Sequence, residues 1–146
     1  MILDTLEIMK RIPHRYPFLL VDRILELDME NQSVKGIKNV TVNEEYFNGH
    51  FPGHPIVPGV IIVEGIAQCL GVLVFEQQGD PEHPKVPYFA AIESVKFKAP
   101  VRPGDQLVYE AQIEKQRRNI VKANGVAKVD GKVVAEVKFT FSIMDK

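Results

Sequence analysis

A nearly continuous apolar run over residues 60–75 constrains the fold more than any other part of the chain. Pro58 and Gly59 lie where a helix would begin, and Gly79 lies where it would end. A helix that is apolar on every side is either buried on every side or placed in a membrane. The chain must therefore provide a cover for this segment or insert it into lipid.

Glu64 and Gln68 are the strongly polar side chains of this run, and they help to decide between the two surroundings. An apolar run of about 18 residues or more can span a bilayer. An acidic side chain near the middle of such a span costs about 2.5–3.5 kcal/mol even on a lenient scale. The run has no flanking cluster of Lys or Arg, and the chain has no Trp. We expect a buried central helix and no membrane insertion.

The composition is ordinary for a soluble globular protein, with 146 residues of which 45% are apolar and 25% charged. We expect residues 1–146 to form a single domain. A net charge of −1 argues against nucleic-acid binding, and one cysteine excludes an internal disulfide. The N-terminus lacks the basic start and the cleavage site of a signal peptide, so we expect a cytoplasmic protein.

Period-two patterns dominate the rest of the chain, most clearly in the alternation of apolar residues from Val133 to Ile143. We predict a short helix over 4–10, strands over 18–28, 33–41, 86–98 (interrupted near Glu93), 107–114, 120–129 and 133–143, turns at 30–32 and 130–131, and an irregular segment over 43–58. Long antiparallel strands with one apolar face, together with one apolar helix, predict an α+β fold with a curved sheet wrapped around the helix.

One half-wrapped sheet cannot cover an apolar helix on all sides. The uncovered part of the helix and the free edge of the sheet would be buried by a second copy of the chain. We therefore expect a homodimer or a larger homo-oligomer.

His50, Gly59 and Glu64 form a candidate catalytic set. His50 precedes a Gly/Pro-rich loop that leads to the helix start, where free N–H groups suit a carbonyl oxygen that gains negative charge. A carboxyl in an apolar pocket has a raised pKa and can act as an acid near neutral pH. The set therefore supplies a base, a donor and an acid for removing a proton beside a carbonyl. The alternative is structural, with His50 capping a turn and Glu64 serving as an internal hydrogen-bonding group.

Three further side chains have open or different interpretations. Gln68 lies one turn after Glu64 and either fixes its carboxyl or bonds to the backbone. His50 and His54 have the spacing of a metal pair, but the prolines between and after them prevent a helix and no third ligand is evident, so we expect no metal. Cys69 is interpreted as a buried small apolar residue and not as a nucleophile.

Two basic groups lie around the strands of the second half, and each is either a solvated face or a docking surface for an acidic partner or a phosphate. The groups are Lys96, Lys98 and Arg102, and Lys115, Arg117 and Arg118.

Three segments, which together extend over essentially the whole chain, resemble one known family. They read His14-Arg-Tyr-Pro-Phe-Leu-Leu-Val-Asp-Arg23, then Asn48-Gly-His-Phe-Pro-Gly-His-Pro-Ile-Val-Pro-Gly-Val60 followed by Glu64 and Ala67-Gln68, then Val95-Lys-Phe-Lys-Ala-Pro-Val-Arg-Pro-Gly-Asp105. The chain resembles the (3R)-3-hydroxyacyl-[acyl-carrier-protein] dehydratases of bacterial fatty acid synthesis (FabZ type).

The resemblance implies a hot-dog fold assembled as dimers and commonly as trimers of dimers, with no cofactor. It implies that His50 is catalytic, that Glu64 acts across the dimer interface on the other chain's site, and that the Gly59 amide polarises the thioester carbonyl. The substrate would be an acyl chain on the phosphopantetheine arm of acyl carrier protein, held in an apolar tunnel. The expected substrate and carrier contacts are Gln68, Lys96, Lys98 and Arg102.

Glu64 bears on two neighbouring activities. A related dehydratase/isomerase subfamily is longer and has Asp at this position, so the chain sides with the plain dehydratases, although Glu64 does not by itself exclude isomerase activity. Two rival functions remain open, a hot-dog thioesterase and a non-catalytic acyl-binding module, and analysis of the reaction product separates them.

Overall fold

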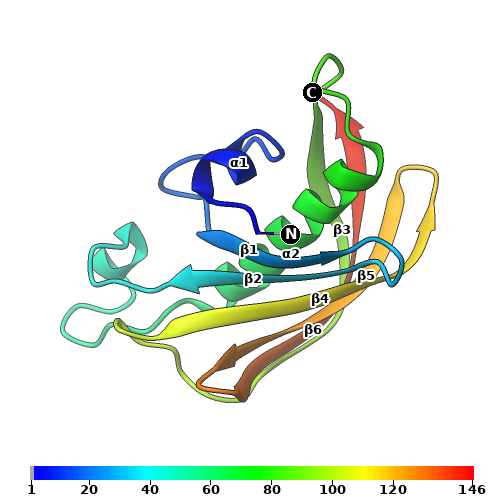
Figure 1. The fold of residues 1–146 in the computed structure, drawn as a ribbon. Helices are drawn as coiled ribbons and strands as arrows, with labels where there is room; N and C mark the ends of the chain where they lie inside the picture. Colours follow the sequence, from blue (N-terminus) through cyan, green and yellow to red (C-terminus); the bar gives the residue numbers. More distant parts are fainter. Residues whose placement is uncertain (1) are drawn as a thin grey trace.

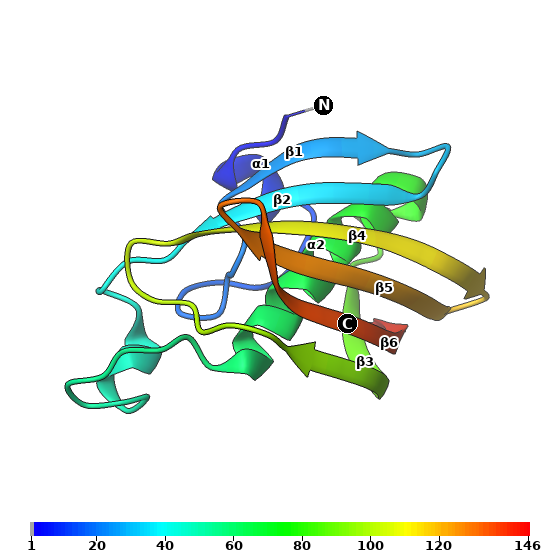
Figure 2. The same cartoon turned by 90° about the horizontal axis from the view of Figure 1, so that it is seen from below.

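The computed structural model describes residues 2–146 and has a six-stranded antiparallel sheet that wraps around one long helix (Figures 1 and 2). The strand order is β1-β2-β4-β5-β6-β3. The elements are α1 Thr5–Met9, β1 Arg23–Asp28, β2 Ser33–Asn39, the 3-10 helix η1 Glu45–Asn48, α2 Gly59–Gln78, β3 Lys85–Phe97, β4 Gln106–Arg117, β5 Ile120–Val129 and β6 Lys132–Asp145. The predicted hot-dog architecture is confirmed.

Helix α2 is the predicted central helix, and it starts and ends where the prolines and glycines indicated. Pro58 is its N-cap, and the Gly79 N–H closes its last turn on the Phe75 carbonyl. It is long and apolar enough to cross a membrane, but most of its residues from Ile62 to Val74 are buried inside the protein. It is therefore the core helix of the sheet.

Two glycines allow α2 and the sheet to approach closely. A Cβ on Gly65 would lie 2.2 Å from the Tyr109 hydroxyl oxygen, and a Cβ on Gly125 would lie 2.6 Å from the Ile66 side chain. Tyr109 is 1% exposed and donates its hydroxyl hydrogen to the Leu20 carbonyl at 3.1 Å. The core thus joins β4, β5 and the segment before β1 to one face of the helix.

Strand β1 begins at Arg23, so the prediction that it starts at Phe18 was wrong. Residues 18–22 instead cross α2, where the Phe18 carbonyl and the Leu20 N–H bond to the side chain of Gln68. The side chain of Gln68 pairs with this backbone at Phe18 and Leu20, and a bond to β2 is made at Asp22, whose N–H donates to the Ile37 carbonyl at 2.8 Å. The alternation of apolar residues cannot reveal the contacts with Gln68.

The prediction that Val133 lies on the core face of β6 was wrong. Lys128 pairs with Val133 and Ala127 pairs with Ala135, so Val134 is an extra residue in a bulge. The bulge shifts the alternation by one residue, which turns Val133 outward and buries Val134. The predicted turn at residues 130–131 is confirmed, with positive φ angles at both positions.

Strand β3 lies at one edge of the sheet, paired with β6 alone. The predicted interruption is confirmed by a register shift between Ile92 and Ser94, and a second shift lies between Phe89 and Ala91. Side chains that pair with the core face of β6 are nevertheless solvent-exposed: Phe89 41%, Ile92 49%, Val95 39% and Phe97 51%.

Candidate active site

His50 lies in the segment between β2 and α2, which projects beyond the end of the sheet (Figure 2). Its N–H donates to the Tyr46 carbonyl at 3.1 Å, at the end of η1. Its ring Nδ1 lies 2.7 Å from the Ile56 carbonyl oxygen, and the Ile56 N–H donates back to the His50 carbonyl at 3.2 Å. Because a carbonyl only accepts, Nδ1 carries the hydrogen and Nε2 is left as the basic nitrogen.

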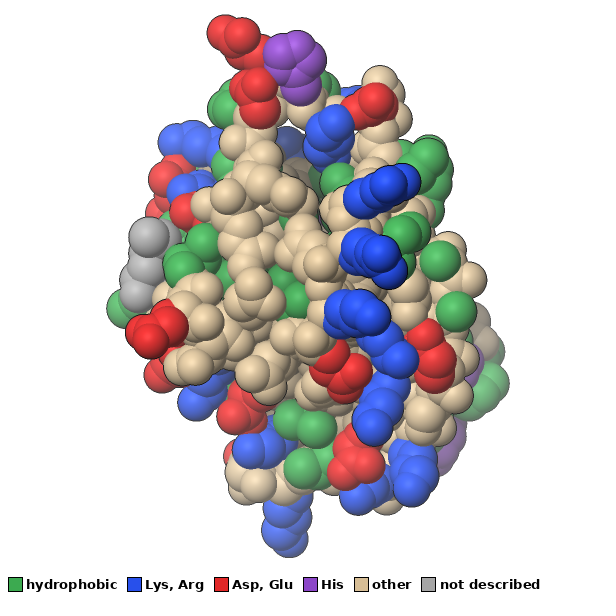
Figure 3. Space-filling view, turned by 90° about the vertical axis from the view of Figure 1, so that its right-hand side faces the viewer, with side chains coloured by type: hydrophobic (Ala, Val, Ile, Leu, Met, Phe, Trp, Pro, Cys, Tyr) green, Lys and Arg blue, Asp and Glu red, His purple; other side chains and the backbone are tan. Residues whose placement is uncertain are grey.

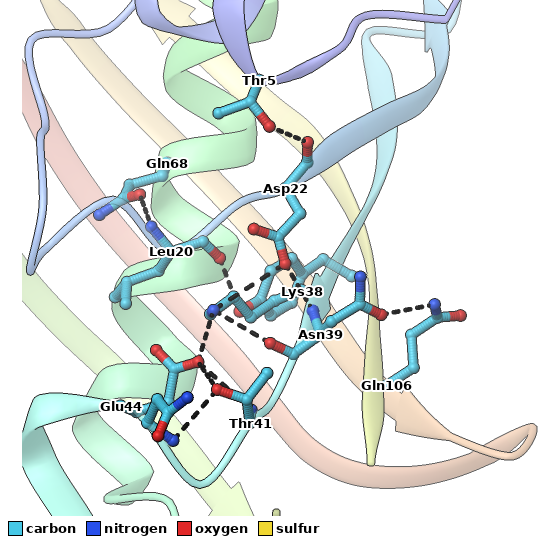
Figure 4. A network of polar contacts seen from close by, with 11 residues as sticks. Thr5, Leu20, Asp22, Lys38, Asn39, Thr41, Glu44, Gln68 and Gln106 are labelled. Atoms are coloured by element: carbon cyan, nitrogen blue, oxygen red, sulfur yellow. Dashed lines mark hydrogen bonds and ion pairs between the residues drawn. The ribbon is translucent and has the colours of Figure 1, made fainter. Parts of the chain in front are cut away.

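The base of this segment is held by Lys38, which is only 8% exposed (Figure 4). Its ammonium donates to Glu44 Oε2 at 3.1 Å and to the Asn39 carbonyl at 3.0 Å, and it lies 3.9 Å from Asp22 Oδ2. The same Glu44 oxygen accepts from the N–H and hydroxyl of Thr41. This network fixes the turn that leads into η1, and hence the backbone that carries His50.

Gly59 begins α2 directly after Pro58, and no side chain caps the helix start. Within residues 2–146 the Gly59 N–H has no hydrogen-bond acceptor, so it remains free for a ligand. The ring of Phe97 lies over the glycine, and a Cβ at this position would be 2.6 Å from the ring edge. The amide predicted to polarise a carbonyl is therefore free to donate and is packed under an aromatic side chain.

Glu64 lies on α2 with its side chain 18% exposed. Burial raises the pKa of its carboxyl, and the hydrogen bond from Gln68 partly offsets this rise. The Gln68 amide donates to Glu64 Oε2 at 2.9 Å. An acid that keeps its proton to a higher pH than an exposed carboxyl does is what the sequence predicted at this position.

Gln68 resolves the two predicted alternatives by doing both. It is 1% exposed and bonds to Glu64, and its side chain also accepts from the Leu20 N–H at 2.8 Å and donates to the Phe18 carbonyl at 2.8 Å. The contact with Leu20 is drawn in Figure 4. Gln68 therefore ties the carboxyl of Glu64 to the segment that crosses the helix.

His14 is a residue of this site that the residue-type analysis missed. Its Nε2 lies 3.5 Å from Glu64 Oε2, with 16% of its side chain exposed. The sequence placed His14 in a turn, and a turn histidine far from Glu64 along the chain gives no sign of this contact. The available signal was its position at the start of the first family-like motif.

Within residues 2–146 no hydrogen bond or ion pair joins His50 to Glu64 of the same chain. Within one chain the histidine on the projecting loop and the carboxyl on the core helix are therefore not in direct polar contact, and we refer to them as two half-sites.

His54, on the same loop as His50, is exposed, and among the described residues no three His, Cys, Asp or Glu side chains are grouped to hold a metal ion. Cys69 is fully buried, and burial raises the pKa of its thiol.

The basic residues lie on the surface of the sheet and its loops, and Lys and Arg side chains form a column down one face of the molecule (Figure 3). Lys98 forms an ion pair with Glu136 at 2.9 Å, and this pair holds the pKa of the glutamate below its usual range. Lys96 and Arg102 are exposed, and their side chains take part in no ion pair within the described residues. Lys96 and Arg102 are therefore the residues of the predicted docking group without an ion pair among the described residues, although Lys96 lies opposite Glu136 in the sheet and its charge helps to lower the pKa of that carboxyl.

A cavity of about 410 Å³ lies at the opposite end of α2 from Gly59. The second half of the helix contributes Gly71, Val74 and Phe75 to its wall, and residues 9–13 and 79–87 contribute much of the rest. Neither His50 nor Glu64 lines it. The cavity is separate from the candidate catalytic groups, and charged side chains such as Lys10, Arg11 and Lys85 line it together with the apolar ones.

The comparisons with known proteins agree on one family. The model of the FabA-like domain matches residues 12–138. The chain is 67% identical over 143 residues to a protein of Fusobacterium nucleatum named 3-hydroxyacyl-[acyl-carrier-protein] dehydratase FabZ, which covers 98% of this chain and 99% of the relative. A Bacillus pumilus protein of the same name is 52% identical, with 99% of this chain and 98% of the relative covered.

Solved structures share the fold at low sequence identity. The dehydratase heterocomplex ApeI:P from Xenorhabdus doucetiae superposes with a TM-score of 0.79 at 15% identity, over 92% of this chain and 89% of that one. The Escherichia coli PaaI protein of the phenylacetic acid degradation operon has a TM-score of 0.61 at 18% identity, over 82% and 80%. At this identity the likeness establishes the fold alone.

Proposed function

The chain belongs to the FabA-like domain family, and from this membership we propose that it removes water from a 3-hydroxyacyl thioester at a site shared by two copies of the chain. Near-complete coverage at 67% identity makes it a 3-hydroxyacyl-[acyl-carrier-protein] dehydratase of fatty acid synthesis. We infer a cytoplasmic enzyme, because its apolar helix is used in the core and its carrier substrate is soluble.

The mechanism rests on the tautomer of His50 and on the raised pKa of Glu64. The bond from His50 Nδ1 to the Ile56 carbonyl leaves Nε2 as a base, and burial keeps Glu64 protonated to a higher pH. Hydrogen-bond donation from the Gly59 amide to the thioester oxygen acidifies the proton on C2. His50 removes that proton, and Glu64 protonates the C3 hydroxyl, which leaves as water and gives the trans-2-enoyl thioester.

A second copy of the chain is needed because the two groups belong to separate half-sites. The exposed apolar face of β3, with Phe89, Ile92, Val95 and Phe97, supports an interface at this edge of the sheet. The free edge of the 13-residue strand β3 also offers backbone donors and acceptors to a partner strand. We propose a homodimer in which Glu64 of one chain faces His50 of the other, assembled further into a trimer of dimers.

The substrate and its carrier are assigned to two surfaces. Gly71 follows Glu64 by two helical turns, about 10 Å along α2, so an acyl chain that runs along the helix from Glu64 would reach the cavity at its far end. Lys96 and Arg102 are exposed and form no ion pair among the described residues, which suits an acidic carrier protein, with Lys98 beside them. Gln68 serves the site by holding Glu64.

The test combines two variants with identification of the product. His50→Ala and Glu64→Gln are each expected to fold and to lose at least about 100-fold in dehydration rate. His54→Ala, on the same loop, is the control and keeps wild-type turnover. Appearance of enoyl absorbance from a 3-hydroxyacyl carrier thioester supports the proposal, whereas free thiol identifies a thioesterase and no product identifies an acyl-binding module. Near-wild-type turnover by either variant removes that residue from the mechanism.

A further inference from the structure

Both polar contacts of the Glu64 carboxyl reach the same oxygen. Oε2 accepts from the Gln68 amide at 2.9 Å and lies 3.5 Å from His14 Nε2. Among residues 2–146 the other oxygen, Oε1, takes no hydrogen bond. The two oxygens of the Glu64 carboxyl therefore have different surroundings.

The burial of the His14 ring indicates which of its two nitrogens carries the hydrogen. Its Nδ1 is buried and has no hydrogen-bond partner among the described residues. Buried N–H groups without a partner are rarer in proteins than under-satisfied acceptors, which favours a bare Nδ1 and a hydrogen on Nε2. Burial, together with the charge of Arg15, lowers the pKa of His14, so the ring is neutral at pH 7. A neutral ring in this tautomer carries its N–H at Nε2, which lies 3.5 Å from Glu64 Oε2.

We propose that His14 is a positioning residue for the acid of the reaction. His14 and Gln68 point two N–H groups at Glu64 Oε2, so the carboxyl cannot rotate freely and its proton resides on Oε1. That oxygen is the one left to give its proton to the leaving hydroxyl. The inference rests on the proposed function for the role of the proton, but the contact itself is a property of the folded chain.

Few charged groups among the described residues face the pair of His14 and Glu64. Arg15 donates its guanidinium hydrogens to the carbonyls of Met9, Ile12 and His14, which holds its charge beside the His14 ring. From α2 the facing groups are Glu64 itself and the neutral Gln68. In the proposed dimer, His50 of the other chain faces the free oxygen Oε1.

The first measurement is the titration of Glu64 itself. The oligomer is labelled with ¹³C at the glutamate side-chain carboxyl carbons, and the Glu64 signal is assigned by its absence in Glu64→Gln. An N–H that faces the carboxylate favours its charged form, so His14→Leu raises the pKa of Glu64 by about one unit. His14→Gln, whose amide nitrogen reaches about as far as Nε2, restores most of the shift, and His54→Leu at an exposed histidine causes none. His14→Asn, whose amide is one carbon shorter than that of Gln, is the second variant and should behave as His14→Leu does. An unchanged or lowered Glu64 pKa in either of these variants, once folded, overturns the proposal.

The second measurement is the pH dependence of turnover. His14→Leu lowers kcat about tenfold with little change in KM, and moves the alkaline limb of the kcat profile to higher pH by the shift seen in the titration. A loss of kcat with no movement of that limb assigns His14 a merely structural role and overturns the proposal. Unchanged turnover in Glu64→Gln would defeat the proposed function while the titration still reported on His14, so the two failures are distinguishable.

Discussion

Replacing Gln68 with Leu is the sharpest test of how the site is built. The side chain makes three hydrogen bonds of 2.8–2.9 Å, to Leu20, Phe18 and Glu64, and Leu can make none of them. The Leu20 N–H is buried and would lose its partner, at a cost of about 1–3 kcal/mol, and the hydrogen bonds to Phe18 and Glu64 contribute about 0.5–1.5 kcal/mol each. The added apolar burial of Leu offsets about 1 kcal/mol of this. We expect Gln68→Leu to lower the free energy of unfolding by about 2–4 kcal/mol.

Urea unfolding at one fixed subunit concentration measures this loss, because the stability of an oligomer depends on concentration. Gln106→Leu is the matched control, since Gln106 is exposed and donates one hydrogen bond to Asn39. The control should change the unfolding free energy by no more than about 0.5 kcal/mol. Gln68→Leu should also raise the pKa of Glu64, because the lost hydrogen bond is one that lowers it. A loss below about 1 kcal/mol, or a Glu64 pKa that does not rise, would refute the role assigned to Gln68.

Three further predictions concern Gly59, the buried carboxyl of Glu64 and the exposed Lys96. Gly59→Ala brings a Cβ to 2.6 Å from the Phe97 ring, so it should destabilise the protein by about 1–3 kcal/mol in urea unfolding, and an unchanged midpoint would contradict the packing. Burial raises the pKa of Glu64, so the contribution of its protonated carboxyl to stability is present below about pH 4 and is lost as pH rises through the folded pKa. Over that pH window the unfolding free energy of the wild type should fall relative to that of Glu64→Gln. Parallel curves of unfolding free energy against pH would argue against the buried carboxyl. Lys96→Glu should raise KM for carrier-bound substrate and spare a small thioester, while Lys132→Glu at the β5–β6 turn changes neither; equal effects on both substrates would exclude docking at Lys96.

Much of the fold was predictable because it depends on local rules. The apolar run of α2 begins after Pro58 and ends at Gly79, as proline and glycine at helix ends indicate. The turn at residues 130–131 and the inward face of most of β6 follow from composition and alternation. The bulge at Val134 escaped prediction, because an extra residue changes the phase of the pattern without changing the residue types.

The candidate catalytic residues could be proposed from the sequence, but their surroundings could not. Glu64 is conspicuous in an apolar helix, and a buried carboxylate requires a reason. Its partner His14 is far from it in the sequence, and Gln68 ties the neighbouring segment to the helix through the Leu20 N–H. Long-range contacts of this kind depend on the path of a loop, which periodicity does not encode. The shared site remains a prediction from the family resemblance and from the uncovered β3 edge.

Mixing two inactive variants tests the shared site most directly. His50→Ala and Glu64→Gln oligomers are combined at equal amounts, dissociated, reassembled and assayed for enoyl product. If each site takes its histidine from one chain and its carboxyl from the other, half of the dimers are mixed and each mixed dimer has one intact site, so about one quarter of wild-type activity returns. No activity above that of the separate variants, in a mixture proven to contain mixed dimers, would contradict the account.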